Sequence, residues 1–232
     1  MAPRHIGIVA CSAEGAALCY RTICVEGARR LGRPHAHPEV SVHTHSLADY
    51  MACIYRGDWQ GVADLMLTAA QKLAATGADF LICPDNTIHQ ALPLVLPRSP
   101  LPWLHIAEEV AAAAVARGFK QLGLTGTRWL VDSAVYPEKL TARGLAFERP
   151  SVAERDEINR IIMDELVCGS FKPEAVAYFQ SIIGRLKDAG CDAVVLGCTE
   201  IPLIMNDGNS PLPTLDSTRL LARAALRRAV GG

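Results

Sequence analysis

Two segments of the chain each end a run of apolar residues with a side chain that can carry a proton. Residues 77–89 run through an apolar stretch to Asp85, and residues 190–202 run through another to Cys198. The segments align without a gap and both begin Gly-x-Asp, so the alignment sets Asp85 against Cys198. Carboxylates and thiols both donate and accept protons in catalysis. The repeat therefore predicts two half-sites that face one another.

The apolar runs before these residues are typical of buried parallel strands in an α/β protein. Ligands in open α/β sheets bind outside the carboxyl ends of the strands. Asn86 and Thr199 lie at equivalent positions just beyond those ends. Polar residues clustered there favour a functional site over a purely structural role.

Length and charge limit the classes of function. The chain has 232 residues, 50% of them hydrophobic, which fits one large domain or two of about 100 residues each. The net charge of −1 favours neither nucleic acid nor an anionic membrane surface as a partner. No apolar run approaches the roughly 20 residues that span a bilayer, and the first residues lack a signal-peptide pattern. We expect a cytoplasmic protein without membrane or nucleic-acid partners.

The sequence offers no clear metal or cofactor site. Its eight cysteines show no CxxC pair and no zinc-type spacing, so free thiols in a reducing cytoplasm are expected. A histidine cluster makes a metal site conceivable, but the lack of acidic residues at ligand spacing favours solvent-facing histidines. No strand end carries a lysine for a pyridoxal phosphate Schiff base. The clustered histidines are His35, His37, His43 and His45.

The order of elements predicts two pseudo-symmetric α/β lobes, each Rossmann-like with a mainly parallel sheet. Residues 6–8, followed by a turn and a helix, are matched by residues 122–124 in the same context. We expect the first lobe to comprise 1–99 and 211–232, the second 100–210, and the site to lie in the cleft between them. Expected strands are 5–11, 38–46, 80–83, 103–106, 121–124, 145–148, the run before Cys198 and 212–215. Expected helices are 16–31, 58–76, 107–117, 133–143, 153–166, 173–189 and 218–230, with a proline-rich connection at 92–102.

Both polar clusters resemble segments of a known enzyme family. Gly197-Cys198-Thr199-Glu200 and Asn86-Thr87-Ile88-His89 are similar to the two signature segments of the aspartate/glutamate racemase family. Residues 6–8, 122–127 and 213–216 also fit the family pattern. The resemblance therefore extends over nearly the whole chain.

The resemblance implies a cofactor-independent racemase. In the family, two cysteines face each other across the substrate α-carbon; one removes the α-proton as a thiolate and the other returns a proton as a thiol. The resemblance also implies a small carboxylic or amino acid as substrate, and a homodimer. It makes Cys198 catalytic and gives substrate-binding roles to Ser12, Asn86, Thr87, Thr127 and Thr199, with His89 and Glu200 beside the reactive residues. Helix capping is an equally good reading for Thr87 and Thr199, as is a helix-start role for His89 and Glu200.

The chain departs from the family at the first catalytic cysteine, because Asp85 occupies that position. Cys83 precedes it by two residues and is expected to be a core residue. A model carboxylic acid titrates about 4.6 pH units below a model thiol, which is roughly 6 kcal/mol of basicity. Burial in a closed site narrows such a gap.

A second departure concerns the substrate side chain. Family members that act on acidic amino acids hold the distal carboxylate with basic residues. Tyr50, Ile54 and Val167 occupy the matching positions here, and Arg56 and Lys172 lie only nearby. Aspartate and glutamate are therefore expected to be poor substrates.

Three functions remain open at this stage. A racemase or epimerase of an amino acid or related α-substituted carboxylic acid would move the α-proton between Asp85 and Cys198. A decarboxylase or other isomerase would use Cys198 alone as the proton donor. A catalytically inactive protein would keep the pocket only to bind a small molecule.

Overall fold

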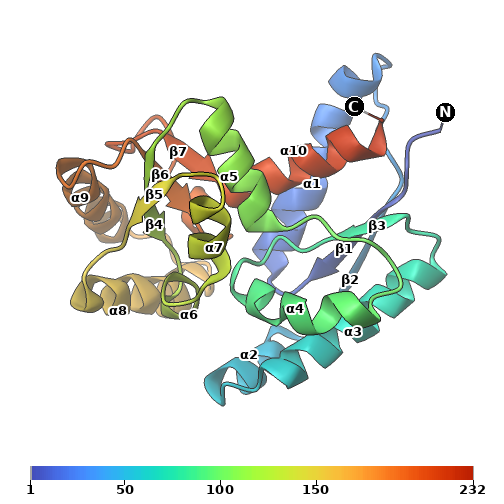
Figure 1. Ribbon diagram of the computed structural model, residues 1–232, viewed down its shortest axis with the longest axis horizontal. Coiled ribbons are helices and arrows are strands. Elements are labelled where there is room, and N and C mark those ends of the chain that lie inside the picture. The colour runs from blue at the N-terminus through green and yellow to red at the C-terminus, as the bar shows by residue number, and fades with distance from the viewer. Residues whose placement is uncertain (1, 232) are drawn as a thin grey trace. The chain divides into compact units, whose positions relative to one another are not determined.

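The computed structural model describes residues 2–231 and divides the chain into two compact units. The first unit holds the chain up to Ile106 and again from Thr218, and the second is Ala107–Ser217. Each unit contains a parallel sheet with helices packed against it (Figure 1). The expected α/β fold with two Rossmann-like lobes is confirmed.

The first unit is built on a three-stranded parallel sheet in the order β2-β1-β3. Its strands are β1 (Ile6–Ala10), β2 (Val40–Thr44) and β3 (Phe80–Ile82). The central strand β1 is buried along its whole length because it pairs on both edges. The parallel register sets Ile8 beside Ile82, so β1 and β3 end at the same edge of the sheet. That edge is where the chain continues to the first polar cluster.

Helices cover both faces of this sheet. The buried side chains of α1 (Ala13–Leu31) and α10 (Ser217–Ala229) form one apolar cluster with alternate residues of β1 and β3. The opposite face packs against α3 (Trp59–Ala75). Gly7 allows this close packing, since a Cβ there would lie 3.3 Å from the Cβ of Leu73.

The last helix returns the end of the chain to the first unit. Arg223 of α10 donates to Glu26 of α1 through Nε at 3.0 Å and Nη2 at 2.8 Å, and Figure 1 shows the two helices side by side. Arg4 N–H also donates to the Ala229 carbonyl at 2.8 Å. The other helical elements of this unit are α2 (Leu47–Tyr55), α4 (Leu92–Val95), and the 3-10 turns Thr87–Ala91 and Leu96–Arg98.

The second unit contains a four-stranded parallel sheet in the order β5-β4-β6-β7. Its strands are β4 (Gln121–Thr125), β5 (Ala146–Glu148), β6 (Ala193–Leu196) and β7 (Thr214–Asp216). Strand β6 pairs on both edges and is buried at every residue. The helices are α5 (Ile106–Ala116), α6 (Arg128–Val131), α7 (Val135–Thr141), α8 (Val152–Arg160) and α9 (Pro173–Asp188), with a π-helical stretch Ile161–Leu166 and a 3-10 turn Ile201–Leu203.

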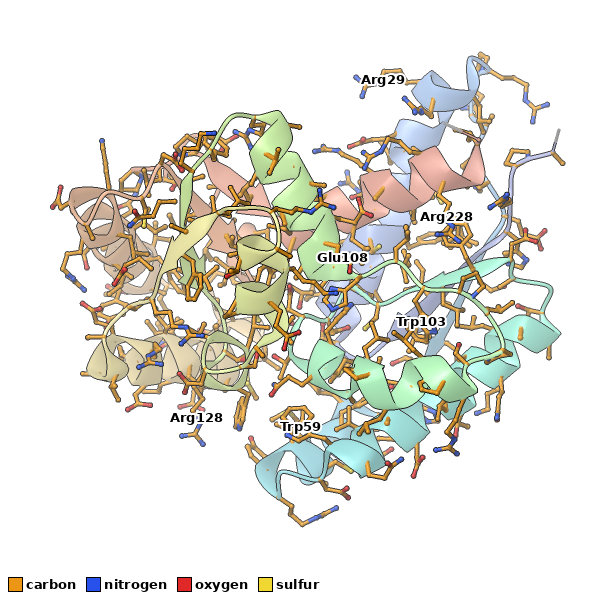
Figure 2. The ribbon with its side chains drawn as sticks, viewed as in Figure 1. Arg29, Trp59, Trp103, Glu108, Arg128 and Arg228 are labelled. Carbon is orange, nitrogen blue, oxygen red and sulfur yellow. The ribbon has the colours of Figure 1, made fainter. Side chains whose placement is uncertain are left out.

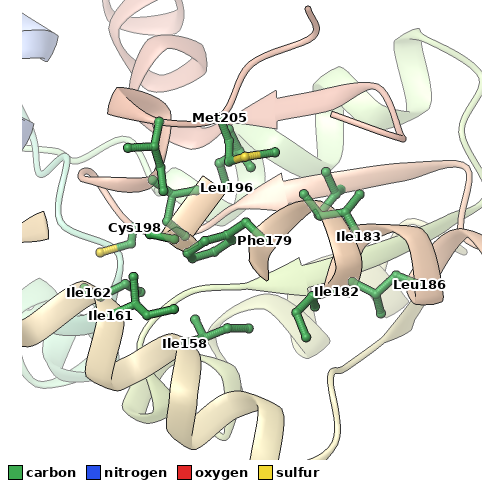
Figure 3. Close-up of a cluster of buried hydrophobic side chains, with 14 of the residues drawn as sticks. Ile158, Ile161, Ile162, Phe179, Ile182, Ile183, Leu186, Leu196, Cys198 and Met205 are labelled. Atoms are coloured by element: carbon green, nitrogen blue, oxygen red, sulfur yellow. The ribbon is translucent and has the colours of Figure 1, made fainter. Parts of the chain in front are cut away.

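The core of the second unit packs α8, the π-helical stretch and α9 against β6 (Figure 3). Gly123 of β4 allows α9 to approach the sheet, because a Cβ there would lie 2.8 Å from Leu186 Cδ1. Cys198 is at the margin of this cluster, and its sulfur points away from Phe179 in Figure 3. The core therefore fixes the backbone of Cys198 while its thiol faces outward from the packed side chains.

Several elements differ from the sequence prediction. Helices α2 and α6 were not expected. The proline-rich connection contains α4 and a 3-10 turn, because Pro93 and Pro97 fall in the first turn of each, where no backbone N–H is needed. Trp103 (labelled in Figure 2) forms only an isolated bridge with Leu81 instead of a strand. The indole of Trp103 donates to Ser99 Oγ at 2.7 Å.

Along the chain, the boundaries between the two units fall a few residues beyond the expected positions. Residues 100–106 stay with the first unit, because Leu81 N–H donates to Pro102 O at 2.8 Å and Leu104 N–H donates to Leu81 O at 3.0 Å. Residues 211–217 stay with the second unit, because β7 pairs with β6.

Candidate active site

The Asp85 carboxylate lies beyond the end of β3 and is held by backbone amides at the start of α1. Cys11 N–H donates to Oδ2 and Ser12 N–H donates to Oδ1, each at 3.1 Å. The N-terminus of a helix favours negative charge, and hydrogen bonds of this kind favour the charged form of a carboxyl group. Asp85 is only 8% exposed. It is therefore a buried carboxyl group with a fixed orientation.

Ser12 is the residue that links this carboxylate to helix α1. Its hydroxyl caps the helix by accepting from Gly15 N–H at 3.2 Å, while its own N–H holds Asp85. Ser12 thus positions Asp85, and its predicted contact with substrate stays a prediction.

His89 fixes the backbone of Asp85 from the other side. Its Nε2 accepts from Ile106 N–H at 3.3 Å, so the proton is on Nδ1, which donates to the Asp85 carbonyl at 3.0 Å. The ring is 1% exposed and packs edge-on against His105, with 4.9 Å between centroids. The contacts show a neutral imidazole that clamps the Asp85 loop to the first residue of α5.

Cys83 is a core residue, as the sequence predicts. It is fully buried, and its thiol donates to the Asp85 carbonyl at 3.7 Å. Burial, with the nearby charge of Asp85, raises the pKa of this thiol well above its usual value, so it stays protonated.

The residues after Asp85 open a 3-10 turn. Asn86 is buried, and its carbonyl accepts from His89 N–H at 3.2 Å. Its side chain makes no capping bond to the turn, and Thr87 is the first residue of that turn instead of its N-cap. Thr87 thus follows the N-cap position of the turn, and its substrate-binding role stays a prediction.

The second polar cluster is organised by one oxygen of Glu200. Cys198 Sγ lies 2.9 Å from Glu200 Oε2, and Thr199 Oγ1 donates to the same oxygen at 2.7 Å. All three residues are buried. Glu200 Oε2 accepts both hydrogen bonds, so Cys198 is a thiol that donates to Glu200. The cluster holds an oriented proton donor.

Thr127 lies just beyond the end of β4, at the start of α6. Its hydroxyl caps α6 by accepting from Leu130 N–H at 3.3 Å, and the residue is 7% exposed. A capping role is thus realised, and substrate binding by Thr127 stays a prediction.

Gly197 brings the Cys198 loop close to the end of β4. Its N–H donates to Thr125 O at 2.9 Å, and a Cβ on Gly197 would lie 2.5 Å from the same oxygen. We expect Gly197→Ala to lower the free energy of unfolding by about 1–3 kcal/mol, the usual cost of an overpacked site. Gly184→Ala is the matched control in the same unit, because nothing lies within 4 Å of its Cβ position in α9. Alanine there should stabilise the helix by up to about 1 kcal/mol.

Urea denaturation of the two variants checks this pair. Equal midpoints for Gly197→Ala and the unchanged protein would contradict the tight contact between the two loops.

By the resemblance, racemases of acidic amino acids carry basic residues at three positions. In this chain those positions hold Tyr50, Ile54 and Val167. Tyr50 and Ile54 are buried on one face of α2, and Val167 is half-buried after the π-helical stretch. The nearby cations are already in ion pairs: Arg56 Nη2 with Asp58 at 3.8 Å, and Lys172 Nζ with Glu165 at 3.4 Å.

No cluster of three or more histidine, cysteine or acidic side chains suited to a metal ion occurs within residues 2–231. His43 of β2 instead contacts a lysine, with Lys72 Nζ 3.0 Å from His43 Nε2. None of the helices in that part of the chain has both the length and the apolar character needed to cross a bilayer.

Each unit thus assembles its own set of predicted site residues. The first brings together Ser12, Asp85 and His89, and the second brings together Cys198, Thr199 and Glu200. Sequence reasoning missed the Cys11 amide, because any residue type supplies a backbone N–H.

The family model for Asp/Glu/hydantoin racemases matches residues 8–225, which is almost the whole chain. The chain belongs to this family. The predicted resemblance is confirmed, and as a member of a racemase family the chain is an isomerase.

Individual relatives support the family assignment. A crystal structure of a candidate Asp/Glu racemase from Yersinia pestis is 28% identical and superimposes with a TM-score of 0.88, covering 98% of this chain and 99% of that one. An aspartate racemase homologue from Pyrococcus horikoshii is 26% identical, with a TM-score of 0.82 and the same coverage. The broad-specificity amino-acid racemase RacX of Bacillus subtilis is 24% identical over 164 residues, which is 69% of each chain.

Proposed function

We propose that the protein is a cofactor-independent racemase or epimerase of an amino acid or related α-substituted carboxylic acid, with α-proton transfer between Asp85 and Cys198. One observation carries the proposal. The equivalent strands β3 and β6 each lead to a proton-carrying group, and hydrogen bonds within each unit favour opposite protonation states: Asp85 ionised and Cys198 protonated. A two-base reaction needs this combination of one base and one acid before substrate binds.

In the proposed reaction, Asp85 takes the α-proton from one face of the substrate. The Cα–H bond breaks, and its electron pair passes into the substrate carboxyl group. The Cys198 S–H bond then breaks, and its proton goes to Cα from the opposite face. The enzyme is left with protonated Asp85 and a Cys198 thiolate, which together carry out the reverse reaction.

Glu200 has two effects on Cys198 in this scheme. Before the reaction, its carboxylate orients the thiol by accepting the S–H bond at 2.9 Å. After the proton has left, the thiolate faces a second anion, and two close anions destabilise one another. The thiolate is therefore a stronger base for the return step.

The polar residues around the reactive pair suit the substrate α-carboxylate. We assign Asn86 and Thr87 to this role in the first unit, and Thr127 and Thr199 in the second. Asn86, Thr127 and Thr199 are each at least nine-tenths buried at the ends of strands. The proposal also includes a homodimer in a reducing cytoplasm, which suits eight free cysteines.

A second candidate function has one observation in its favour. The two amides that hold Asp85 stabilise its anion, and a stabilised carboxylate is a weaker base. A reaction that needs only a proton donor, such as decarboxylation followed by protonation from Cys198, avoids this difficulty.

The test of the proposed function is α-proton exchange in D2O, followed by NMR, with a panel of amino acids and malonate-type acids. We expect exchange with inversion for neutral amino acids, and values of kcat/KM below about 10⁴ M⁻¹s⁻¹ for aspartate and glutamate. The reason is that Tyr50, Ile54 and Val167 occupy the positions where, by the resemblance, racemases of acidic amino acids carry basic residues. Fast aspartate racemisation would contradict the neutral side-chain preference, and decarboxylation without amino-acid exchange would favour the second candidate.

A further inference from the structure

A buried hydroxyl close to Asp85 has no hydrogen-bond partner in the protein. Tyr50 is 0% exposed, and its Oη is both buried and unpartnered. Buried polar groups in folded proteins are nearly always paired. Phenylalanine would fill the same space without burying a hydroxyl, so the hydroxyl calls for a partner that a ligand supplies.

Two further unpartnered atoms lie on the two histidine rings next to Tyr50. The rings of Tyr50 and His45 are 6.3 Å apart, those of His45 and His43 are 4.8 Å apart, and both pairs meet edge-on. His43 Nδ1 and His45 Nε2 are buried without a partner, like Tyr50 Oη. Three unpaired polar atoms therefore lie on neighbouring rings of the first unit.

These rings lie between a cation at the His43 end and the Asp85 carboxyl group at the Tyr50 end. Lys72 Nζ is 3.0 Å from His43 Nε2; burial and the Lys72 charge both lower the pKa of His43. Burial raises the pKa of Tyr50, and the nearby Cys11, Cys83 and Asp85 raise it further, so the phenol keeps its proton. A second carboxylate at this place would face the charge of Asp85.

We propose that Tyr50 Oη binds the side chain of the substrate through a neutral hydrogen-bonding group, a hydroxyl or a carboxamide. The inference rests on the proposed function for the position of the α-carbon next to Asp85. It adds the substrate class: polar, uncharged amino acids such as serine or glutamine are preferred to apolar ones of the same size.

The test compares Tyr50→Phe with the unchanged protein on matched substrates, serine with 2-aminobutyrate and glutamine with norleucine. The variant is expected to lose about 10- to 100-fold in kcat/KM for the polar member that binds, with little change for its apolar partner. The midpoint of thermal unfolding without ligand should stay the same or rise, because an unpaired buried hydroxyl has been removed.

Tyr136→Phe is the matched control. Tyr136 is equally buried, but its hydroxyl bonds Ser217, whose own proton goes to the Leu196 carbonyl at 2.8 Å. Tyr136→Phe should lower the midpoint of thermal unfolding and leave the ratio of kcat/KM for polar to apolar substrates unchanged.

Binding is followed separately by the rise in unfolding temperature that each amino acid causes. If Tyr50→Phe still exchanges the α-proton and its ratio of kcat/KM for polar to apolar substrates equals that of the unchanged protein, the inference is overturned and the racemase proposal stands. No exchange, with polar ligands losing their stabilising effect only in Tyr50→Phe, would support the inference and overturn the racemase. A wild-type protein that exchanges the apolar members but neither binds nor exchanges a polar one would overturn the inference alone, and one that binds no polar member and exchanges no member of either kind would overturn the racemase as well.

Discussion

Replacing Cys198 by serine is expected to lower the rate of α-proton exchange by at least 10²–10⁴-fold, the usual loss for a proton-transfer group. Serine keeps the size of the side chain and can still donate to Glu200, which the thiol contacts at 2.9 Å. A hydroxyl is far less acidic than a thiol, so it cannot release its proton to the carbanion at a comparable rate. The expected loss is therefore in kcat more than in KM.

Cys168→Ser is the control for this experiment. Cys168 is exposed, and its thiol only donates to the Met163 carbonyl at 3.7 Å. This variant should retain full activity. Wild-type exchange by Cys198→Ser would mean that the thiol is not the proton donor, and both the racemase and the single-cysteine reaction would fall.

Asp85→Asn is expected to abolish racemisation in both directions, with a loss of similar size. Microscopic reversibility makes Asp85 the base for one enantiomer and the acid for the other, so one substitution removes both steps. Structure adds a second consequence. The carboxylate accepts from Cys11 N–H and Ser12 N–H, whereas an amide offers one oxygen and one NH2 group to the same two donors. One buried donor loses its partner, at a cost of about 1–3 kcal/mol in the free energy of unfolding.

The loss of stability must be separated from the loss of chemistry. Asp79→Asn serves this purpose, because Asp79 Oδ2 accepts from His5 N–H at 2.7 Å in the same unit. Asp79→Asn should affect urea denaturation without affecting exchange. If Asp85→Asn is folded and still active as a decarboxylase, the carboxylate is not a base and Cys198 works alone. If it still racemises amino acids at the wild-type rate, the assignment of Asp85 is wrong.

The sequence alone determined the fold class and the family. Buried parallel strands such as β1 and β6 are covered on both faces, so they appear as continuous apolar runs that are easy to recognise. The Gly-x-Asp repeat and the polar residues after each run were enough to identify the family. Helix starts were less well determined: α1 begins at Ala13, three residues earlier than expected, because Ser12 caps it.

Only the tertiary structure decided what surrounds each reactive group. The donors to Asp85 are backbone amides 73 and 74 residues away in sequence, and no side-chain type identifies them. They reach Asp85 because β1 and β3 pair in parallel and end at one edge of the sheet.

The same holds for the surroundings of Glu200 and Tyr50. Glu200 follows Cys198 by two residues, yet only the turn after β6 folds its carboxylate back to within 2.9 Å of the thiol. Tyr50 is a polar residue on an apolar helix face, and sequence does not reveal whether its hydroxyl finds a partner. Hydrogen bonding depends on distances of a few tenths of an ångström between segments far apart in the chain. Those distances are a property of the packed structure and are not encoded in any local pattern.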